Sequence, residues 1–370
     1  MKLLQLILFV LAPQRRRAGW SGPPGHSGVA AVFAALALLF APWPLAADAP
    51  QSAVPPAGIP VASPQAAGVA SGAAAELRTV DLDWFDEARQ RPVPVRLYLP
   101  PTADGDRTLP LVVFSHGMGG SRRGYSYLGA YWASQGYASL HLQHVGSDRS
   151  LWAGNVFGLV SRLHAAASDE EAVARVGDLR FALDRLLADP ELGTRIDATR
   201  IVGAGHSYGA NTILLAVGAR VERDGRVVDL ADPRLAGAIL ISAPPFYGES
   251  DLQRIVAGVR VPTLHVTATE DDIRIPGYYS GVEDRISVFE AMPGARKVLA
   301  VFAGGSHSMF TDRAATGGLA LNAQVKAATR ELSLAFLRSV FAGDEGDDRA
   351  LRDWPQRYDG IVARFVAGGS

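Results

Sequence analysis

The chain has 370 residues, with 36 Lys and Arg against 37 Asp and Glu, and a calculated isoelectric point near 6.7. This charge balance, with no basic run beyond the N-terminal region, argues against a nucleic-acid-binding protein. The chain contains no cysteine, which excludes disulfides, thiolate metal sites and a cysteine nucleophile. A chain of this length can bury a core without covalent cross-links, so the lack of disulfides does not exclude export.

Residues 1–49 have the features of an export signal. Arg15–Arg17 precede an apolar stretch from Val29 to Phe40 that is short for a membrane span. Ala47–Ala49 fits a small-residue cleavage pattern. We expect a periplasmic or secreted protein with no stable membrane insertion after signal removal. An uncleaved anchor is the alternative, because Leu3–Ala12 forms a second apolar run, and a true start after Gln14 is a further one.

Residues 50–76 are rich in Ala, Pro, Gly and Ser and almost uncharged, which indicates a flexible linker. A single folded domain is therefore expected over residues 77–370. The sequence shows no internal repeat.

The folded part alternates strand and helix patterns. Residues 77–84 and 92–100 predict an antiparallel pair, and 109–116 form a continuous apolar run typical of a buried strand. Further strands are expected at 137–143, 200–205, 236–243, 261–269 and 297–304, and helices at 125–135, 168–187, 209–219 and 318–341. This alternation predicts an α/β protein with a mostly parallel sheet and helices on both faces. Ligands of such sheets bind beyond the carboxyl ends of the strands.

The clearest predicted helix begins at Ser168, which with Glu171 has the pattern of a capping box. Apolar residues recur at helical spacing along it, and Pro190 marks its end. Residues 146–168 are expected to include a cap over the site, 222–230 a small hairpin, and 344–348 a solvated linker before a C-terminal helix.

Gly205-His206-Ser207-Tyr208-Gly209 is the only G-x-S-x-G pattern in the chain, and it stands between a predicted strand and a predicted helix. In that context the serine occupies a sharp, strained turn, and glycines let the strand and helix approach closely. The helix directs its N-terminal N–H groups and positive dipole end toward the same place. We therefore predict that Ser207 is a nucleophile rather than part of a plain glycine-rich turn.

A serine hydroxyl needs a base, and only His265 and His307 follow Ser207 along the chain. His265 lies inside an apolar strand and is expected to be a core residue, whereas His307 follows a strand in a glycine-rich loop. We predict His307 as the base. A carboxylate must orient it, and Asp271 is our choice with Asp272 as the alternative. The resulting order of Ser, Asp and His is that of one known triad.

An oxyanion hole requires backbone N–H donors. The N–H of Tyr208 follows the nucleophile, and the loop after residue 114 offers the N–H of Met118. His116 is expected to hold this loop without moving protons. His141 and His144 could form a metal pair, but no third ligand is evident, and hydrogen bonding in a loop is the preferred interpretation.

Together, "SHGMGG", "GHSYG", the Asp271 segment and "GGSHS" resemble the α/β-hydrolase superfamily. Within it, residues 110–148 look most like bacterial predicted dienelactone hydrolases, related to platelet-activating-factor acetylhydrolases and cutinase-like enzymes. The resemblance spans about Leu77 to Phe341. It implies the α/β-hydrolase fold and ester hydrolysis through an acyl-serine, with no metal or organic cofactor. True dienelactone hydrolases use a cysteine nucleophile, which this chain lacks, so their substrate is not carried over.

The sequence thus predicts a serine hydrolase acting on a small-molecule or lipid-like ester. A lipase or polyester hydrolase is an alternative on the same machinery. A catalytically silent binding protein on a hydrolase scaffold is an alternative of another class.

Overall fold

A computed structural model describes residues 77–101, 108–275, 278–294, 296–313, 318–342 and 345–368. The expected export region, residues 1–49, and the expected linker, residues 50–76, lie outside the described residues.

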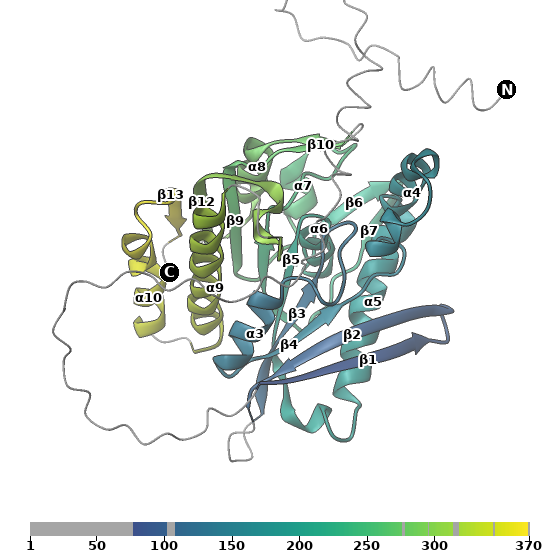
Figure 1. Cartoon of the computed structure of the whole chain (residues 1–370), viewed down its shortest axis with the longest axis horizontal. Coiled ribbons are helices and arrows are strands. Elements are labelled where there is room, and N and C mark those ends of the chain that lie inside the picture. Colours follow the sequence, from purple (N-terminus) through teal and green to yellow (C-terminus); the bar gives the residue numbers. More distant parts are fainter. Residues whose placement is uncertain are drawn as a thin grey trace, which may run out of the picture. The chain divides into compact units, whose positions relative to one another are not determined.

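Nine strands of the described residues form one sheet in the order β1-β2-β4-β3-β5-β8-β9-β12-β13 (Figure 1). Their bounds are β1 Arg78–Asp86, β2 Arg91–Leu99, β3 Leu109–Ser115, β4 Ala138–Leu142, β5 Ile196–His206, β8 Leu235–Ile241, β9 Thr263–Glu270, β12 Lys297–Ser306 and β13 Val362–Ala367. The strands from β4 to β12 pair in parallel. β2 is antiparallel to β1 and β4, and β13 is antiparallel to β12. The carboxyl ends of β3, β5, β9 and β12 therefore share one edge.

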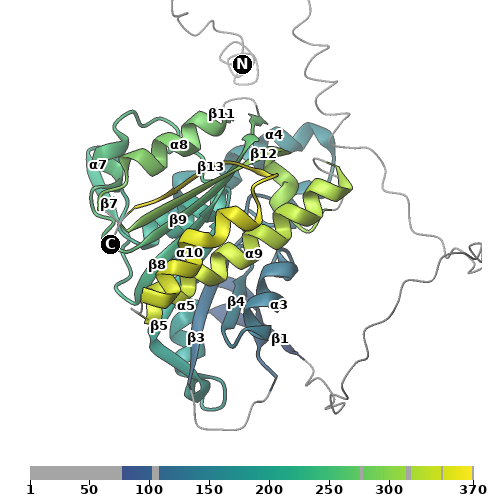
Figure 2. The ribbon, with the colours of Figure 1, turned by 90° about the vertical axis from the view of Figure 1, so that its left-hand side faces the viewer.

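Helices cover both faces of this sheet. Their bounds are α3 Ser126–Ser134, α4 Leu159–Ala166, α5 Asp169–Leu187, α6 Tyr208–Ala216, α7 Leu252–Val256, α8 Val282–Ala291, α9 Leu319–Ala342 and α10 Glu345–Arg357. One hydrophobic core joins the sheet to α5, α6, α7 and α8, and a second joins it to α3, α9 and α10. Figure 2 shows α9 and α10 side by side in front of the sheet.

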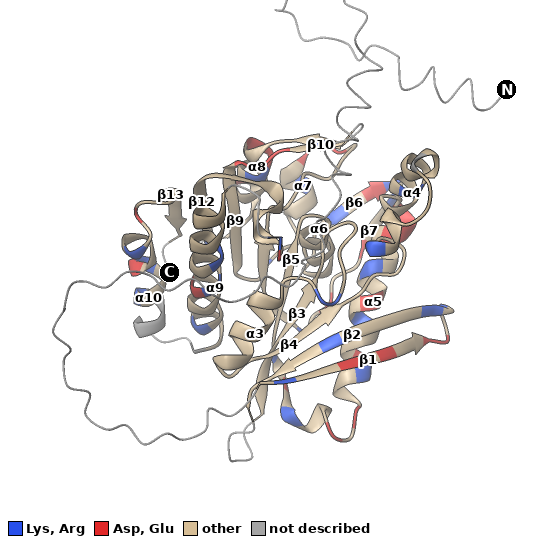
Figure 3. Cartoon of the chain, viewed as in Figure 1, with Lys and Arg blue, Asp and Glu red and all other residues tan. Residues whose placement is uncertain are grey.

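The strand β3 shows why these strands read as unbroken apolar runs. Leu111 and Val113 belong to one core, and Val112 and Phe114 to the other. Successive side chains of a strand point to opposite faces, so a strand covered on both faces must be apolar throughout. Charged residues lie instead on elements such as β1, β2 and α5: Figure 3 shows mostly acidic residues on β1, basic residues on β2 and both signs on α5.

The predicted strands and helices are confirmed to within a few residues, and so is the hairpin, formed by β6 Arg220–Arg223 and β7 Arg226–Asp229. A second hairpin, β10 Ile273–Ile275 with β11 Tyr278–Ser280, was not predicted, nor were α7, α8 and β13. The linker expected at 344–348 is wrong from Glu345 onward, because α10 begins there.

The capping box expected at the start of α5 is only half present. The Ser168 hydroxyl accepts the N–H of Glu171, as a cap should. The Glu171 carboxylate turns instead to Arg91 and to the Ser147 hydroxyl. Hydrogen bonds from the Arg91 guanidinium and the Ser147 hydroxyl stabilise the buried Glu171 carboxylate more than one bond from a backbone N–H at the helix end would.

The turn from β5 to α6 brings backbone segments close together at the carboxyl edge. Ser207, at its apex, has φ 55° and ψ −125°. A Cβ on Gly205 would lie 2.4 Å from the Gly209 carbonyl oxygen, and a Cβ on Gly209 would lie 1.9 Å from the Ser115 carbonyl oxygen. Both glycines are therefore required because backbone passes against backbone.

None of the helices in the described part of the chain is long and apolar enough to cross a membrane.

The close packing of the turn predicts that Gly209→Ala disrupts it. The added methyl meets backbone rather than a movable side chain, so we expect a loss of stability of about 3 kcal/mol or more, or failure to fold. Gly360→Ala is the matched control, since its Cβ would meet nothing within 4 Å. Urea unfolding of both variants measures this; equal stabilities would contradict the close packing.

Burial of His265 predicts a pH-dependent stability. Desolvation, aided by Lys297, lowers the pKa of His265 to about 3. In the unfolded chain His265 binds a proton below about pH 6.5, whereas in the folded protein it stays neutral until about pH 3. Proton binding therefore favours the unfolded state between these pH values, and the free energy of unfolding falls as the pH is lowered from about 6.5 toward 3. At pH 5 the loss is about 2 kcal/mol. We expect His265→Gln to narrow the stability difference between pH 7 and pH 5 by that amount in urea unfolding. An unchanged difference would show that His265 binds its proton at pH 5 as readily in the folded protein as in the unfolded chain.

Candidate active site

Ser207 stands at the carboxyl end of β5 with its side chain at the sheet edge. A positive φ in a non-glycine residue is strained by about 1–3 kcal/mol and persists only where surrounding structure enforces it. Here the Ser207 N–H donates to the Ile241 carbonyl at 2.9 Å, and its own carbonyl accepts the N–H of Ala210 at 2.8 Å. These two hydrogen bonds hold the strained backbone of Ser207 in place, and they thereby fix the direction in which its side chain leaves the turn.

His307 lies beside this hydroxyl. Its Nε2 is 2.8 Å from the Ser207 Oγ, and its Nδ1 is 2.7 Å from the Asp271 Oδ1. A carboxylate can only accept, so Nδ1 carries the proton and Nε2 is left to accept from the Ser207 hydroxyl. The residues come from the ends of β5, β9 and β12, three strands whose carboxyl ends share one edge. The structure thus brings together the three side chains that the sequence singled out.

Asp271 is completely buried. Its Oδ2 accepts the Thr267 hydroxyl at 2.7 Å, and the Arg285 Nε lies 3.5 Å from its Oδ1. Burial works to raise the pKa of Asp271, but His307 and Arg285 outweigh it, so the pKa falls well below its ordinary value. The alternative, Asp272, is exposed and pairs with Arg274 at 2.7 Å. Asp271 rather than Asp272 therefore reaches the imidazole.

The loop after β3 passes next to Ser207. A Cβ on Gly117 would lie 3.2 Å from the Ser207 Cβ, so this loop borders the hydroxyl directly. In the described residues, the backbone N–H groups of Met118 and Tyr208 have no hydrogen-bond acceptor. Tyr208 is the first residue of α6, where N–H groups have no partner within the helix. Two N–H groups without an acceptor thus belong to the segments next to Ser207, one in the loop after β3 and one at the start of α6.

His116 holds the loop, as the sequence predicted. Its Nδ1 donates to the Gly117 carbonyl at 2.7 Å, and its Nε2 accepts the N–H of His144 at 3.1 Å. Burial and the nearby Arg175 charge keep the pKa of His116 well below its ordinary value. Both ring nitrogens are therefore engaged in hydrogen bonds of a neutral ring, so His116 is not placed to act as a general acid or base.

His206 has a role that the sequence did not reveal. Its Nε2 donates to the His307 carbonyl at 3.0 Å, and its Nδ1 accepts the Tyr125 hydroxyl at 2.8 Å. Burial, with the nearby His307, lowers the pKa of His206 to about 3, so the ring stays neutral. His206 joins the turn of Ser207 to the loop of His307. Thr267 and Arg285 were missed as well, because single residues in a strand and a helix carry no motif.

The two histidines weighed as a metal pair have other partners. His141 lies 3.2 Å from the Gly124 carbonyl and 3.0 Å from the Ser139 hydroxyl. His144 bonds Ser115 and Asp178, each at 3.0 Å. In the part of the chain that the structure describes, no group of His, Asp and Glu side chains could hold a metal ion.

Aromatic side chains lie around the edge of the site. The Trp152 indole N–H donates to the Gly119 carbonyl at 3.1 Å, which sets this ring against the loop after β3. His164 on α4 faces Tyr278 with 6.3 Å between ring centroids. Residues 146–168, where a cap was expected, thus contact the loop on one side and face the β10–β11 hairpin on the other.

Comparisons with known proteins agree with this architecture. A profile of the family platelet-activating factor acetylhydrolase, isoform II, matches residues 99–171. A solved ferulic acid esterase from Streptomyces cinnamoneus is similar over 74% of this chain and 93% of that chain, with a TM-score of 0.54 and 23% identity. A search of curated proteins gave no match. The strand order, the strained serine between β5 and α6 and the likeness to this structure show that the chain has the α/β-hydrolase fold.

Proposed function

We propose that this chain is a serine-dependent carboxylic-ester hydrolase that works through an acyl-serine intermediate. The observation that carries the proposal is the hydrogen-bonded series Ser207–His307–Asp271, with distances of 2.8 and 2.7 Å. Each distance is already short enough for proton transfer or charge stabilisation without rearrangement. The esterase fold neighbour and the acetylhydrolase profile support the same reaction class.

The reaction would run in two halves. Ser207 Oγ attacks the ester carbonyl while His307 Nε2 takes its proton, and Asp271 stabilises the imidazolium that forms. The N–H groups of Met118 and Tyr208 hold the oxyanion. His307 then protonates the departing alcohol, which leaves the acyl group on Ser207. In the second half, His307 takes a proton from water, the hydroxide attacks the acyl carbon, and the proton returns to Ser207 Oγ as the acid departs.

The aromatic border favours an ester with an apolar part. Trp152 lies against the loop that carries Met118, and Phe157 is 91% exposed in the neighbouring segment. A small-molecule or lipid-like ester fits this border, and a lipase or polyester hydrolase remains a candidate on the same machinery. Rates measured over a series of acyl chain lengths separate these substrates. The N-terminal pattern leads us to propose export to the periplasm or medium.

The first test removes the nucleophile. Ser207→Ala should lower turnover of p-nitrophenyl acetate by about 10⁴-fold or more, as for a nucleophile that acts within a triad. Ser134→Ala is the control, because this exposed hydroxyl bonds the Tyr131 carbonyl and the neighbouring Gln135 side-chain amide at the end of α3, away from Ser207. Labelling by a fluorophosphonate probe should be lost in Ser207→Ala alone. Equal turnover by wild type and Ser207→Ala would overturn the proposed function, and turnover no faster than the uncatalysed reaction in both would favour a silent binding protein.

A second test separates the two neighbouring carboxylates. Asp271→Asn puts an amide against His307 Nδ1 and favours the wrong tautomer, so kcat should fall by about 10⁴-fold. Asp272→Asn removes only an exposed pair with Arg274 and should change kcat by less than about threefold. Steady-state kinetics of both variants provide the measurement. A larger loss in Asp272→Asn than in Asp271→Asn would overturn the assignment.

A further inference from the structure

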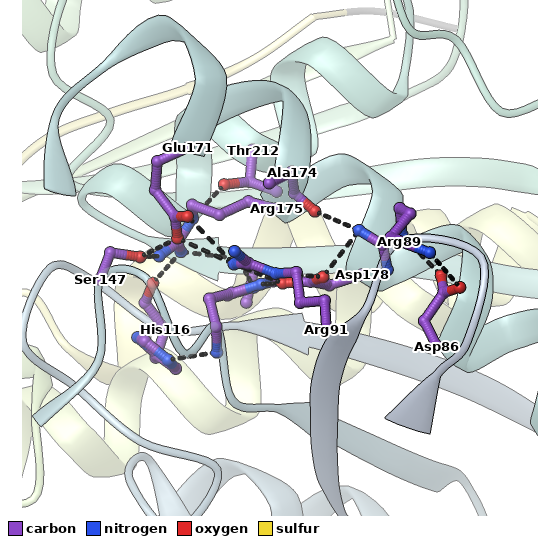
Figure 4. Close-up of polar contacts among 12 residues, drawn as sticks. Asp86, Arg89, Arg91, His116, Ser147, Glu171, Ala174, Arg175, Asp178 and Thr212 are labelled. Carbon is purple, nitrogen blue, oxygen red and sulfur yellow. Dashed lines mark hydrogen bonds and ion pairs between the residues drawn. The ribbon is translucent and has the colours of Figure 1, made fainter. Parts of the chain in front are cut away.

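Arg175 on α5 is fully buried beneath the loop after β3 and the first turn of α6. Its Nε donates to the Thr212 hydroxyl at 2.9 Å, and its Nη1 to the Ser147 hydroxyl at 2.7 Å. Its Nη2 donates to the Ser115 hydroxyl at 3.0 Å and also to the His116 carbonyl. Figure 4 shows this fork of hydrogen bonds. We propose that Arg175 is a positioning residue that sets the two oxyanion N–H donors, an inference that rests on the proposed function.

The first donor is placed through the loop. Arg175 holds the His116 carbonyl, and the following Gly117 carbonyl is held by the His116 Nδ1 at 2.7 Å and the Gly120 N–H at 3.0 Å. The C=O and N–H of a trans peptide point in opposite directions. With its Gly117 carbonyl held in this way, the Met118 N–H must point away from His116.

The second donor is placed through α6. The Thr212 hydroxyl accepts from Arg175 and donates to the Tyr208 carbonyl at 3.1 Å. The guanidinium carbon also lies 4.5 Å from the centroid of the Tyr208 ring. The Arg175 side chain therefore contacts both segments that carry the donors, the loop after β3 and the first turn of α6. The two donors, Met118 and Tyr208, are 90 residues apart in the chain.

The charge arrangement around Arg175 points to a role beyond packing. No carboxylate of the described residues lies within ion-pair distance of Arg175. Hydrogen bonds connect it to carboxylates only indirectly, through Ser147 to Glu171 and through Ser115 and His144 to Asp178. The carboxylates of Glu171 and Asp178 pair directly with Arg91 instead. Burying a guanidinium without a direct carboxylate is costly, and an apolar side chain would fill the place at less cost. The positive charge of Arg175 is therefore not neutralised by direct contact with a carboxylate of the described residues.

The test uses Arg175→Lys and Thr212→Val, with Arg89→Met as the matched control. Lysine keeps the charge but loses the planar fork, and valine removes only the hydroxyl that joins Arg175 to Tyr208. Arg89 pairs with Asp178 in the same network but contacts neither the loop after β3 nor α6. The probes are p-nitrophenyl acetate and an aryl trifluoromethyl ketone, which forms a hemiketal oxyanion on a serine nucleophile.

We expect kcat to fall about 10- to 100-fold in Arg175→Lys and about fivefold in Thr212→Val, with KM changed by less than about twofold. The inhibition constant of the ketone should rise by the same factors, because both quantities report the oxyanion. Arg89→Met should leave both within about twofold of wild type, whatever its effect on melting temperature.

The outcomes separate this inference from the proposed function. The proposed function is wrong if the wild-type protein has no esterase turnover, or if Ser207→Ala leaves that turnover unchanged. If wild type is active but folded Arg175→Lys and Thr212→Val match Arg89→Met in kcat and ketone inhibition, the positioning role is wrong. Should Arg175→Lys fail to fold by circular dichroism, Thr212→Val decides the question alone.

Discussion

The site depends on the close approach of α6 to the end of β3. Because Gly209 has no side chain, the first turn of α6 lies against the Ser115 carbonyl. That contact brings the Tyr208 N–H and the loop of Met118 to the same side of Ser207. It also leaves Ser207 at a positive φ with its hydroxyl held toward His307. A looser turn would relieve the strain, but it would move the loop of Met118 away from Ser207.

Around this contact, buried neutral histidine side chains form hydrogen bonds that hold the neighbouring segments together. His116, His144 and His206 are buried with lowered pKa values, so each has one donor and one acceptor nitrogen. Each ring spans two segments: His116 and His144 join the loop after β3 to the loop after β4, and His206 joins Ser207's turn to His307. Protonating any of them would break an accepted hydrogen bond. The same burial that orients the site therefore makes it sensitive to acid.

The sequence was most informative where a local pattern has one physical meaning. Continuous apolar runs predicted strands covered on both faces, and glycines around Ser207 predicted a tight turn, because no other residue fits such contacts. Patterns with several possible partners were less informative. Nothing local distinguishes Asp271 from Asp272, since the choice depends on which side chain the chain turns toward Thr267 and His307. Arg175 and Arg285 look like ordinary helix residues, and only tertiary packing shows that they are buried. The acidic run at 344–348 resembled a linker because α10 gains its stability from Leu351 and Trp354 further along.

The fixed charges on the two sides of Ser207 match the charges that ester hydrolysis creates. In the proposed reaction, attack on the ester would move a proton to His307, which would become a cation beside the buried anion of Asp271. At the same moment the carbonyl oxygen would become an anion near the proposed N–H donors, whose loop is bonded to Arg175. Each developing charge thus meets an opposite charge that is already in place and cannot reorient, which is the condition under which electrostatic stabilisation costs no reorganisation during the reaction. Asp271 and Arg175 have their own costs of burial met by fixed hydrogen bonds, so the folding of the protein, rather than the substrate, supplies the free energy needed to prepare the site.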